Sequence, residues 1–377
     1  MFTYRGLTLL LSFTLVVATS VIVGLLIIVL HRTLPNLAQL RDDLQATQRS
    51  HLMPTPRLGG IAILASIITI LFVQPEQSPS WFTGLCISLV PVAATGLAED
   101  LGLNVSPKRR LLAAALSSIL AIAMVGIWVP RVDIVGVDFL MQWKVIAFTF
   151  TVVATAGVCH AFNLIDGING LAGGFAISAL VGLSIVAGHT ENAGTAEIGL
   201  LLIAAILGFL LLNFPFGKIF LGDAGAYSLG HIVVWYAIYL VWTMDDLTAW
   251  SIALILFWPI MDTLYSMYRR SKTGKPMDHP DRLHFHQVVM RVIQITSSGR
   301  IKMSVANPLA TIMIAPFFAG PIIVGTLLWD QPLFAALSLL GFAMAFVGTY
   351  QFLITVANFR LRDRRTHIFG AASQQSL

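Results

Sequence analysis

The sequence predicts an all-α, polytopic integral membrane protein with about 11 transmembrane helices. Hydrophobic residues make up 57% of the 377 residues, and only 11% carry a charged side chain, against about a quarter in soluble domains. Apolar runs long enough to cross a bilayer recur along the whole chain. This composition excludes a soluble globular enzyme and a disordered chain. Despite the net charge of +5, a nucleic-acid partner is not expected.

Eleven apolar segments approach the roughly 17 to 25 residues that a transmembrane helix needs. The second and third are the weakest of these segments, and the first is too long for the apolar core of a signal peptide. No long polar insert interrupts the series, so residues 1–377 are predicted to form a single integral membrane domain. The predicted spans are 7–30, 58–73, 82–98, 110–129, 144–161, 172–189, 197–214, 226–243, 248–267, 307–328 and 333–356.

The distribution of basic residues predicts the orientation of these spans. Eleven spans divide the loops into two sets, and one set holds all but three of the 23 Lys and Arg residues; the exceptions are Arg5, Arg131 and Lys144. Because basic loops stay in the cytoplasm, that set is predicted to be cytoplasmic. The N-terminus is then outside and the C-terminus inside.

Five polar motifs lie on the predicted cytoplasmic side, at helix ends. They are His51–Gly60, Glu99–Asp100, Asn163–Gly174, Asn213–Gly225 and Asp278–His286. Carboxylates next to a membrane are costly unless they pair or bind an ion. Mg²⁺ takes oxygen ligands and usually substrate phosphates, so this grouping is typical of an active site.

Two of the motifs combine carboxylates with glycine. If residues 163–166 are helical, Asn163 and Asp166 share one face; the alternative is simple helix packing through the glycines that follow. Gly222-Asp223-Ala224-Gly225 predicts a tight loop before a helix, where backbone N–H groups could meet phosphate.

Three further carboxylates have competing interpretations. Glu99 and Asp100 are adjacent, so on a helix they point about 100° apart and do not both face one ligand; the alternative is a solvated helix end balanced by residues 108–110. Asp262 lies within a predicted span and is expected to pair with Arg269 or Arg270.

His284 and His286, with His279 and Arg282, form the densest histidine cluster. No cysteine and no third clearly spaced ligand accompany the His284/His286 pair, so anion binding is favoured over a transition-metal site. The other histidines are interpreted as structural or interfacial: His31, His160, His189, His231 and His367.

Together, these motifs between residues 49 and 287 resemble, in order, the polyprenyl-phosphate N-acetylhexosamine-1-phosphate transferase family, glycosyltransferase family 4. The resemblance implies a bacterial cytoplasmic (inner) membrane enzyme with its active site on the cytoplasmic face. It would transfer a sugar 1-phosphate from a UDP-amino sugar to undecaprenyl phosphate, release UMP, and use Mg²⁺, with Mn²⁺ as an alternative. The product would start a lipid-linked polysaccharide such as O-antigen or teichoic acid.

The resemblance also implies roles for individual residues. Asp100, Glu99 and Asp223 would be catalytic, with Asp223 binding the metal ion. Phe220 would pack on uracil, and the two histidines would face the diphosphate. The full set of implied substrate-binding residues is Asn163, Asp166, Asn213, Phe220, Arg282, His284, His286, His51 and Arg57.

Four positions depart from the family pattern: Glu99 replaces the first Asp of a pair, Gln287 a third histidine, Ala226 a serine and Leu103 a lysine. An inactive family member is therefore one alternative. A phospho-N-acetylmuramoyl-pentapeptide transferase is another, disfavoured by the form of the 269–286 loop. A secondary transporter would instead place its polar groups near the bilayer midplane. Direct attack by the lipid phosphate and a covalent phospho-aspartyl route both stay open.

Overall fold

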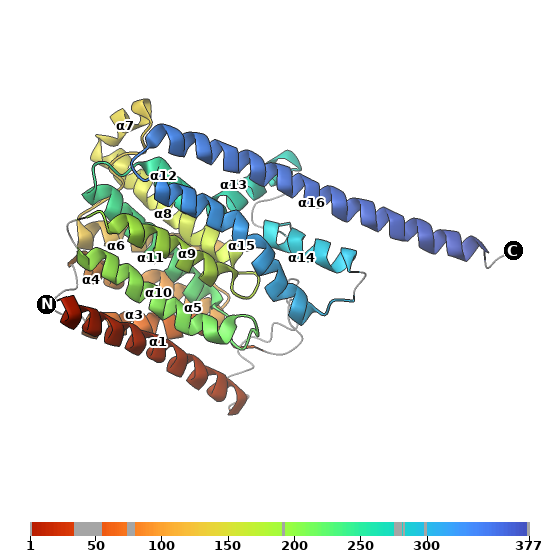
Figure 1. The fold of residues 1–377 in the computed structure, drawn as a ribbon, viewed down its shortest axis with the longest axis horizontal. Coiled ribbons are helices and arrows are strands. Elements are labelled where there is room, and N and C mark those ends of the chain that lie inside the picture. The colour runs from red at the N-terminus through yellow and green to blue at the C-terminus, as the bar shows by residue number, and fades with distance from the viewer. Residues whose placement is uncertain are drawn as a thin grey trace.

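The computed structural model describes residues 2–33, 55–73, 80–190, 193–274, 281, 283–297 and 300–374, and within them all regular structure is helical (Figure 1). The helices in chain order are α1 (Phe2–Thr33), α3 (Gly59–Val73), α4 (Ser80–Ser88), α5 (Val90–Asp100), α6 (Pro107–Val125), α7 (Val135–Met141), α8 (Lys144–Ile165), α9 (Leu171–Ala187), α10 (Ala193–Asn213), α11 (Gly222–Thr243), α12 (Ala249–Ile255), α13 (Phe257–Lys272), α14 (Phe285–Thr296), α15 (Met303–Leu327) and α16 (Pro332–Gln374).

Each of the 11 predicted spans coincides with a helix or a helix pair. Among the described residues, seven helical segments are long and apolar enough to cross a membrane, with α4 and α5 counted together as Ser80–Asp100. The bent pair α12–α13 would make an eighth. The helices α3 and α9 are apolar but shorter, while α6 begins with Lys108, Arg109 and Arg110. An integral membrane protein is thus supported, whereas the count of 11 and the orientation of the termini stay predictions.

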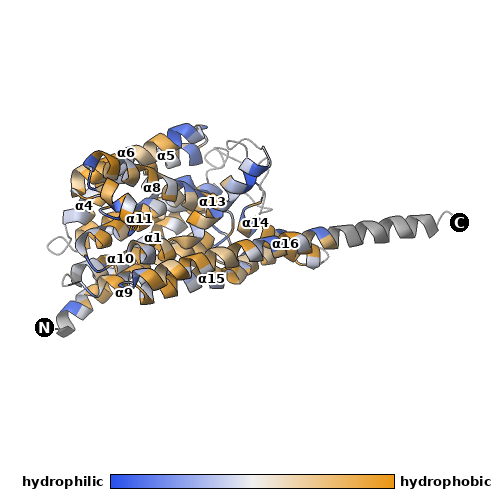
Figure 2. Ribbon diagram, turned by 90° about the horizontal axis from the view of Figure 1, so that it is seen from above, coloured by the Kyte–Doolittle hydropathy of each residue, from blue (hydrophilic) through white to orange (hydrophobic). Residues whose placement is uncertain are grey.

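Two spans differ in shape from the prediction. The segment expected as one straight helix over 248–267 bends by 79° between α12 and α13. The last helix continues well past residue 356, and α16 protrudes from the bundle (Figure 1). Most of the bundle's residues are apolar (Figure 2), and many large apolar side chains on α1, α15 and α16 are exposed, as expected for a surface that faces lipid rather than water.

Helix α11 lies at the centre of the bundle and is apolar all round, which is typical of a buried helix. Of the 18-residue apolar stretch within α11, 94% is buried. The helix packs against α3, α5, α8 and α9. One continuous apolar core extends from Val16 on α1 to Tyr350 on α16.

The start of α11 is held by glycine contacts with two neighbouring helices. A Cβ on Gly60 of α3 would lie 2.3 Å from the backbone nitrogen of Gly225, and a Cβ on Gly96 of α5 would lie 2.5 Å from that of Ala224. Small residues allow such backbone approach between membrane helices. The sequence Gly222–Gly225 is therefore fixed between α3 and α5.

We predict that Gly96→Ala displaces the start of α11. The added methyl group meets backbone atoms that have no side-chain freedom, so the free energy of unfolding should fall by about 1–3 kcal/mol. Thermal unfolding of the purified protein, followed by tryptophan fluorescence, measures this loss. The control is Gly157→Ala on α8, where a Cβ meets nothing within 4 Å; equal stability of the two variants would contradict the prediction.

Candidate active site

Asp223 lies in the first turn of α11 and is only 4% exposed. Gly222, with a φ of 75°, turns the chain into the helix; this left-handed conformation favours glycine. The preceding loop pairs with residues 56–60, because Phe220 N–H donates to Pro56 O (2.9 Å) and Gly59 N–H donates to Phe220 O (2.8 Å). The described part of the first motif therefore lies against the Gly-Asp-Ala-Gly motif.

Two arginines pair with the Asp223 carboxylate. Arg110 of α6 donates a hydrogen bond to it, and Arg57 approaches its Oδ1 to 3.5 Å. The sequence interpretation gave Arg110 only a general balancing charge near Glu99 and Asp100, so this specific partner was missed. Guanidinium groups bind phosphate as well as carboxylate, so this cluster is suited to phosphate groups.

Asp100 is the C-terminal residue of α5, and it binds the first turn of α11. Its Oδ1 accepts the N–H of Asp223 (2.8 Å) and its Oδ2 accepts that of Ala224 (2.9 Å). A carboxylate at a helix N-terminus is stabilised by the exposed N–H groups and the helix dipole. Asp100 thus fixes the position of the Asp223 backbone.

Glu99 points elsewhere: its Oε2 accepts the N–H of Val105 (2.6 Å). The expectation that Glu99 and Asp100 face different partners agrees with this geometry. The alternative of a solvated helix end is wrong, because the two residues are 8% and 7% exposed.

The Asn163–Gly174 motif is only partly helical. Helix α8 ends at Ile165, and Asp166 has a φ of −77° and a ψ of 55°, outside the helical region. The expected helical face shared by Asn163 and Asp166 is therefore wrong. Both side chains are partly exposed. Burial raises the pKa of Asp166 to about 7; Arg57 opposes the shift, and the charges of Asp223 and Asp100 add to it.

Asn213 connects this loop to the loop before α11. Its Oδ1 accepts the N–H of Gly170 (2.7 Å), and its Nδ2 donates to Ile219 O (2.8 Å). Both partners are backbone atoms and the side chain is 5% exposed, so the contacts of Asn213 are structural. Phe220 is partly exposed beside it.

Two side chains of α15 also hold the Asn163–Gly174 loop in place, and the sequence interpretation did not include them. Asn307 of α15 accepts the N–H of Asn169 (2.8 Å), and Thr311 of the same helix donates to the carbonyl of Asn169 (2.7 Å). The signal available in the sequence was an amide side chain at the start of the apolar span 307–328, since a polar group in a membrane helix requires a specific partner.

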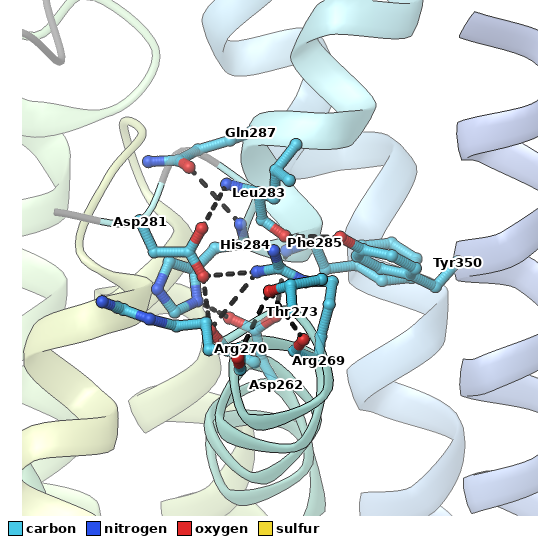
Figure 3. Close-up of polar contacts among 11 residues, drawn as sticks. Asp262, Arg269, Arg270, Thr273, Asp281, Leu283, His284, Phe285, Gln287 and Tyr350 are labelled. Atoms are coloured by element: carbon cyan, nitrogen blue, oxygen red, sulfur yellow. Dashed lines mark hydrogen bonds and ion pairs between the residues drawn. The ribbon is translucent and has the colours of Figure 1, made fainter. Parts of the chain in front are cut away.

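The histidine cluster rests on a network of buried ionic groups, shown in Figure 3. His284 Nδ1 lies 2.9 Å from Asp262 Oδ2, and Asp262 Oδ1 accepts the N–H of Phe285 (2.9 Å). Arg269 pairs instead with Asp281. The expected pair of Asp262 with Arg269 or Arg270 is therefore replaced by an Asp262–His284 pair, because both Asp281 and His284 contact side chains of α13.

The ring of His286 lies beside this network. The rings of His284 and His286 are parallel within 9° at 6.0 Å. A Cβ on Gly167 would lie 2.1 Å from His286 Nε2, so this histidine touches the Asn163–Gly174 loop. Burial lowers the pKa of His286 to about 4, which favours the neutral form of its ring.

Two predicted site residues, His51 and Arg282, lie outside the described residues. Among the residues that are described, no group of three or more His, Cys, Asp or Glu could hold a metal ion by themselves. The transition-metal interpretation of the histidine cluster gains no support from this part of the chain.

Three of the remaining histidines have structural contacts. His231 Nε2 lies 2.8 Å from Ser88 Oγ, and His160 Nδ1 lies 3.1 Å from the Tyr227 hydroxyl. The ring of His189 stacks on Trp329 at the far end of the bundle.

Comparison with known proteins gives consistent results. The sequence model of Glycosyl transferase family 4 matches residues 82–241, which include Asp100, Asp166 and Asp223. The chain is 28% identical over 256 residues to a probable undecaprenyl-phosphate N-acetylglucosaminyl 1-phosphate transferase of Bacillus subtilis, covering 66% of this chain and 69% of that protein.

Two other relatives carry related names. An undecaprenyl-phosphate alpha-N-acetylglucosaminyl 1-phosphate transferase of Yersinia pestis is 28% identical over 246 residues, covering 63% of this chain and 66% of the relative. A decaprenyl-phosphate N-acetylglucosaminephosphotransferase of Mycobacterium tuberculosis is 28% identical over 282 residues, covering 66% and 68%. The resemblance predicted from the ordered motifs is confirmed.

We predict that Asp262→Asn changes how stability depends on pH. Burial lowers the pKa of His284, but the hydrogen bond and the charge of Asp262 outweigh burial and raise the pKa of His284 above the usual 6.5. The contribution of this pair is complete below pH 6.5 and is lost as pH rises through the folded-state pKa. Without Asp262, burial dominates and lowers that pKa, so stability should instead rise with pH.

Thermal unfolding between about pH 5.5 and 8.5 measures the two slopes. Near neutral pH the free energy of unfolding should also fall by about 1–3 kcal/mol, because a buried charge-assisted hydrogen bond is lost. Asp330→Asn, at an exposed carboxylate in the α15–α16 turn, is the matched control. Parallel pH profiles for all three proteins would refute the proposed Asp262–His284 pair.

Proposed function

We propose that this chain, which resembles glycosyl transferase family 4 over residues 82–241, transfers an N-acetylhexosamine or deoxy amino sugar 1-phosphate from a UDP-sugar to undecaprenyl phosphate. UMP leaves, and the lipid diphosphate sugar starts a surface polysaccharide such as O-antigen or teichoic acid. The reaction takes place at the cytoplasmic face of the bacterial inner membrane. The names of the relatives support the general reaction and the polyprenyl phosphate acceptor.

The observation that carries this proposal is the arrangement around Asp223. A buried carboxylate lies at a helix N-terminus with Arg57 and Arg110 paired to it. Phosphoryl transfer depends mainly on positioning and on neutralising the charge of the transferred group. The arginines supply that charge when a nucleotide sugar and a lipid phosphate meet beside α11.

The donor set also fits Mg²⁺. This ion is usually held by one or two carboxylates together with substrate phosphates and water, so a preformed cage of three protein ligands is not required. Asp223 would hold the ion, with Asp166 as the second carboxylate within electrostatic reach. When bound, the ion would neutralise charge on the phosphates.

In the proposed reaction, an oxygen of the lipid phosphate attacks the phosphorus that carries the sugar. A new P–O bond forms, the bond from that phosphorus to the UMP oxygen breaks, and UMP takes the electron pair. The acceptor phosphate is already ionised, so little base catalysis is needed. We therefore favour a positioning role for Asp100, whose two oxygens both hold the α11 backbone.

The histidine segment would bind the diphosphate from the opposite side. The His286 ring touches Gly167, which places it beside the loop that carries Asp166. His284, whose pKa the paired Asp262 raises, lies next to it. Arg282 and His51 are included in the proposed site from the family resemblance alone.

A transport function is less well supported by the geometry. The polar cluster around Asp223 lies at the first turn of α11, a helix end, whereas transporters bind near the bilayer midplane. The muramoyl-pentapeptide donor is disfavoured by the names of the relatives, which specify N-acetylglucosamine.

We predict that purified protein transfers radiolabel from UDP-N-acetylglucosamine or a related UDP-amino sugar to undecaprenyl phosphate, with UMP released in equal amount. EDTA should abolish the transfer and Mg²⁺ should restore it. A panel of UDP-sugars, including UDP-N-acetylmuramoyl-pentapeptide, identifies the donor. No lipid product with any donor would refute the function, and labelled protein formed without lipid would favour the covalent route.

We predict that Asp223 and Asp100 differ when each is replaced by Asn. Asp223→Asn should lower kcat by at least about 10²-fold, as expected when a charge-stabilising group is lost. Asp100→Asn should raise the Mg²⁺ concentration for half-maximal rate but leave the pH profile unchanged. Loss of one limb of the pH profile in Asp100→Asn would instead identify it as the base.

A further inference from the structure

A second site candidate lies at the end of the bundle opposite Asp223. A cavity of about 510 Å³ opens where α9 and α11 end and α10 begins, within the usual volume range of ligand pockets. Since α11 has 22 residues, this cavity is roughly 30 Å from Asp223. The proposed transferase reaction does not use it.

Three aromatic side chains belong to the lining of the cavity. His189 and Trp329 stack at 4.6 Å with an interplanar angle of 19°, and Tyr239, also in the lining, is held by a stacking contact with Trp81 at 4.3 Å. Aromatic faces attract organic cations and pack against methylene groups. These side chains are fixed by contacts that exist without a ligand.

Two carboxylates at the cavity have no described counter-charge. Asp245 and Asp246 line it and are exposed, and no ion pair to either occurs among the described residues. Arg5 bonds Glu197 (2.7 Å). Arg131 lies beside the two carboxylates, donating to the backbone carbonyls of Met244, Asp245 and Leu247, but its charge is offset by Asp133, whose Oδ1 lies 3.4 Å from its Nε. The cavity is therefore electronegative.

Thr195 provides an independent indication of a ligand. It lines the cavity and is 1% exposed, yet its Oγ1 has no hydrogen-bond partner within the described part of the chain. Its backbone carbonyl is already bonded to the Tyr236 hydroxyl (2.8 Å). A buried unpaired hydroxyl costs about 1–3 kcal/mol, a cost that a ligand N–H donor would remove.

These features favour an ammonium group over a metal ion. The described residues offer no group of three metal ligands, and the aromatic lining suits a carbon chain rather than a hydrated ion. We propose that this cavity binds a primary alkylammonium group, with Asp245 and Asp246 pairing with its charge and Thr195 accepting one N–H. The source is either a soluble amine or the aminoethyl head group of a phospholipid.

Binding here would stabilise the folded protein by mass action, because the ligand joins the ends of α9, α10, α11 and α15. The purified full chain is titrated with 1,4-diaminobutane, and thermal unfolding is followed by tryptophan fluorescence. We expect a saturable rise in Tm. NaCl at equal ionic strength should not reproduce it, and any rise with MgCl₂, an ion that the proposed Asp223 site would bind, should persist when Asp245 and Asp246 are replaced.

Three variants locate the effect. Asp245→Asn combined with Asp246→Asn should weaken the apparent affinity about 10-fold or more, and Thr195→Val by about 3- to 10-fold. Asp330→Asn, an exposed carboxylate in the α15–α16 turn and not in the lining, should bind normally. Equal loss in Asp330→Asn, a shift that follows ionic strength, or an unchanged diaminobutane response in the aspartate double variant would overturn the proposal.

Nanodiscs distinguish the two sources. Protein in phosphatidylethanolamine discs should have a higher Tm than in phosphatidylglycerol discs, and the aspartate variants should lose that difference, if the lipid head group is the ligand. A response to diaminobutane in phosphatidylglycerol discs without such a lipid effect identifies a soluble amine. Neither response in the wild type would refute the site.

Discussion

The contact on which the candidate site depends is the one between Asp100 and the first turn of α11. Both carboxylate oxygens of Asp100 accept backbone N–H groups of that turn. A negatively charged residue at the C-terminus of α5 therefore caps the positive N-terminal end of the α11 dipole. Gly60 and Gly96 allow the backbones to approach closely enough for this contact. Everything that surrounds Asp223 is positioned by this arrangement.

Around that fixed turn, loops far apart in the sequence are held by buried polar side chains. Asn213 ties the loop after α8 to the loop before α11, and Asn307 ties the same region to α15. The Asp262–His284 pair holds the segment that brings His286 against Gly167. In an apolar environment each such amide or ion must find a partner, and here those partners are the loops of the site.

The two ends of α11 have opposite electrostatic character. At one end, Arg57 and Arg110 pair with the carboxylate of Asp223, which suits the phosphate groups of the proposed substrates. At the other, Asp245 and Asp246 line a cavity with aromatic residues, while Arg5 pairs with Glu197 and Arg131 with Asp133. The modest net charge of +5 therefore hides two chemically distinct surfaces joined by one rigid, buried helix.

The sequence by itself determined the helical membrane architecture, the segments that carry the chemistry and the family resemblance, because apolar length and local motifs are properties of contiguous residues. It did not determine that α8 ends before Asp166, that Arg110 pairs with Asp223, or that Asp262 pairs with His284. Those partners are separated by up to 113 residues. Only the packing of helices decided them, since buried charges choose partners by three-dimensional proximity rather than by spacing along the chain.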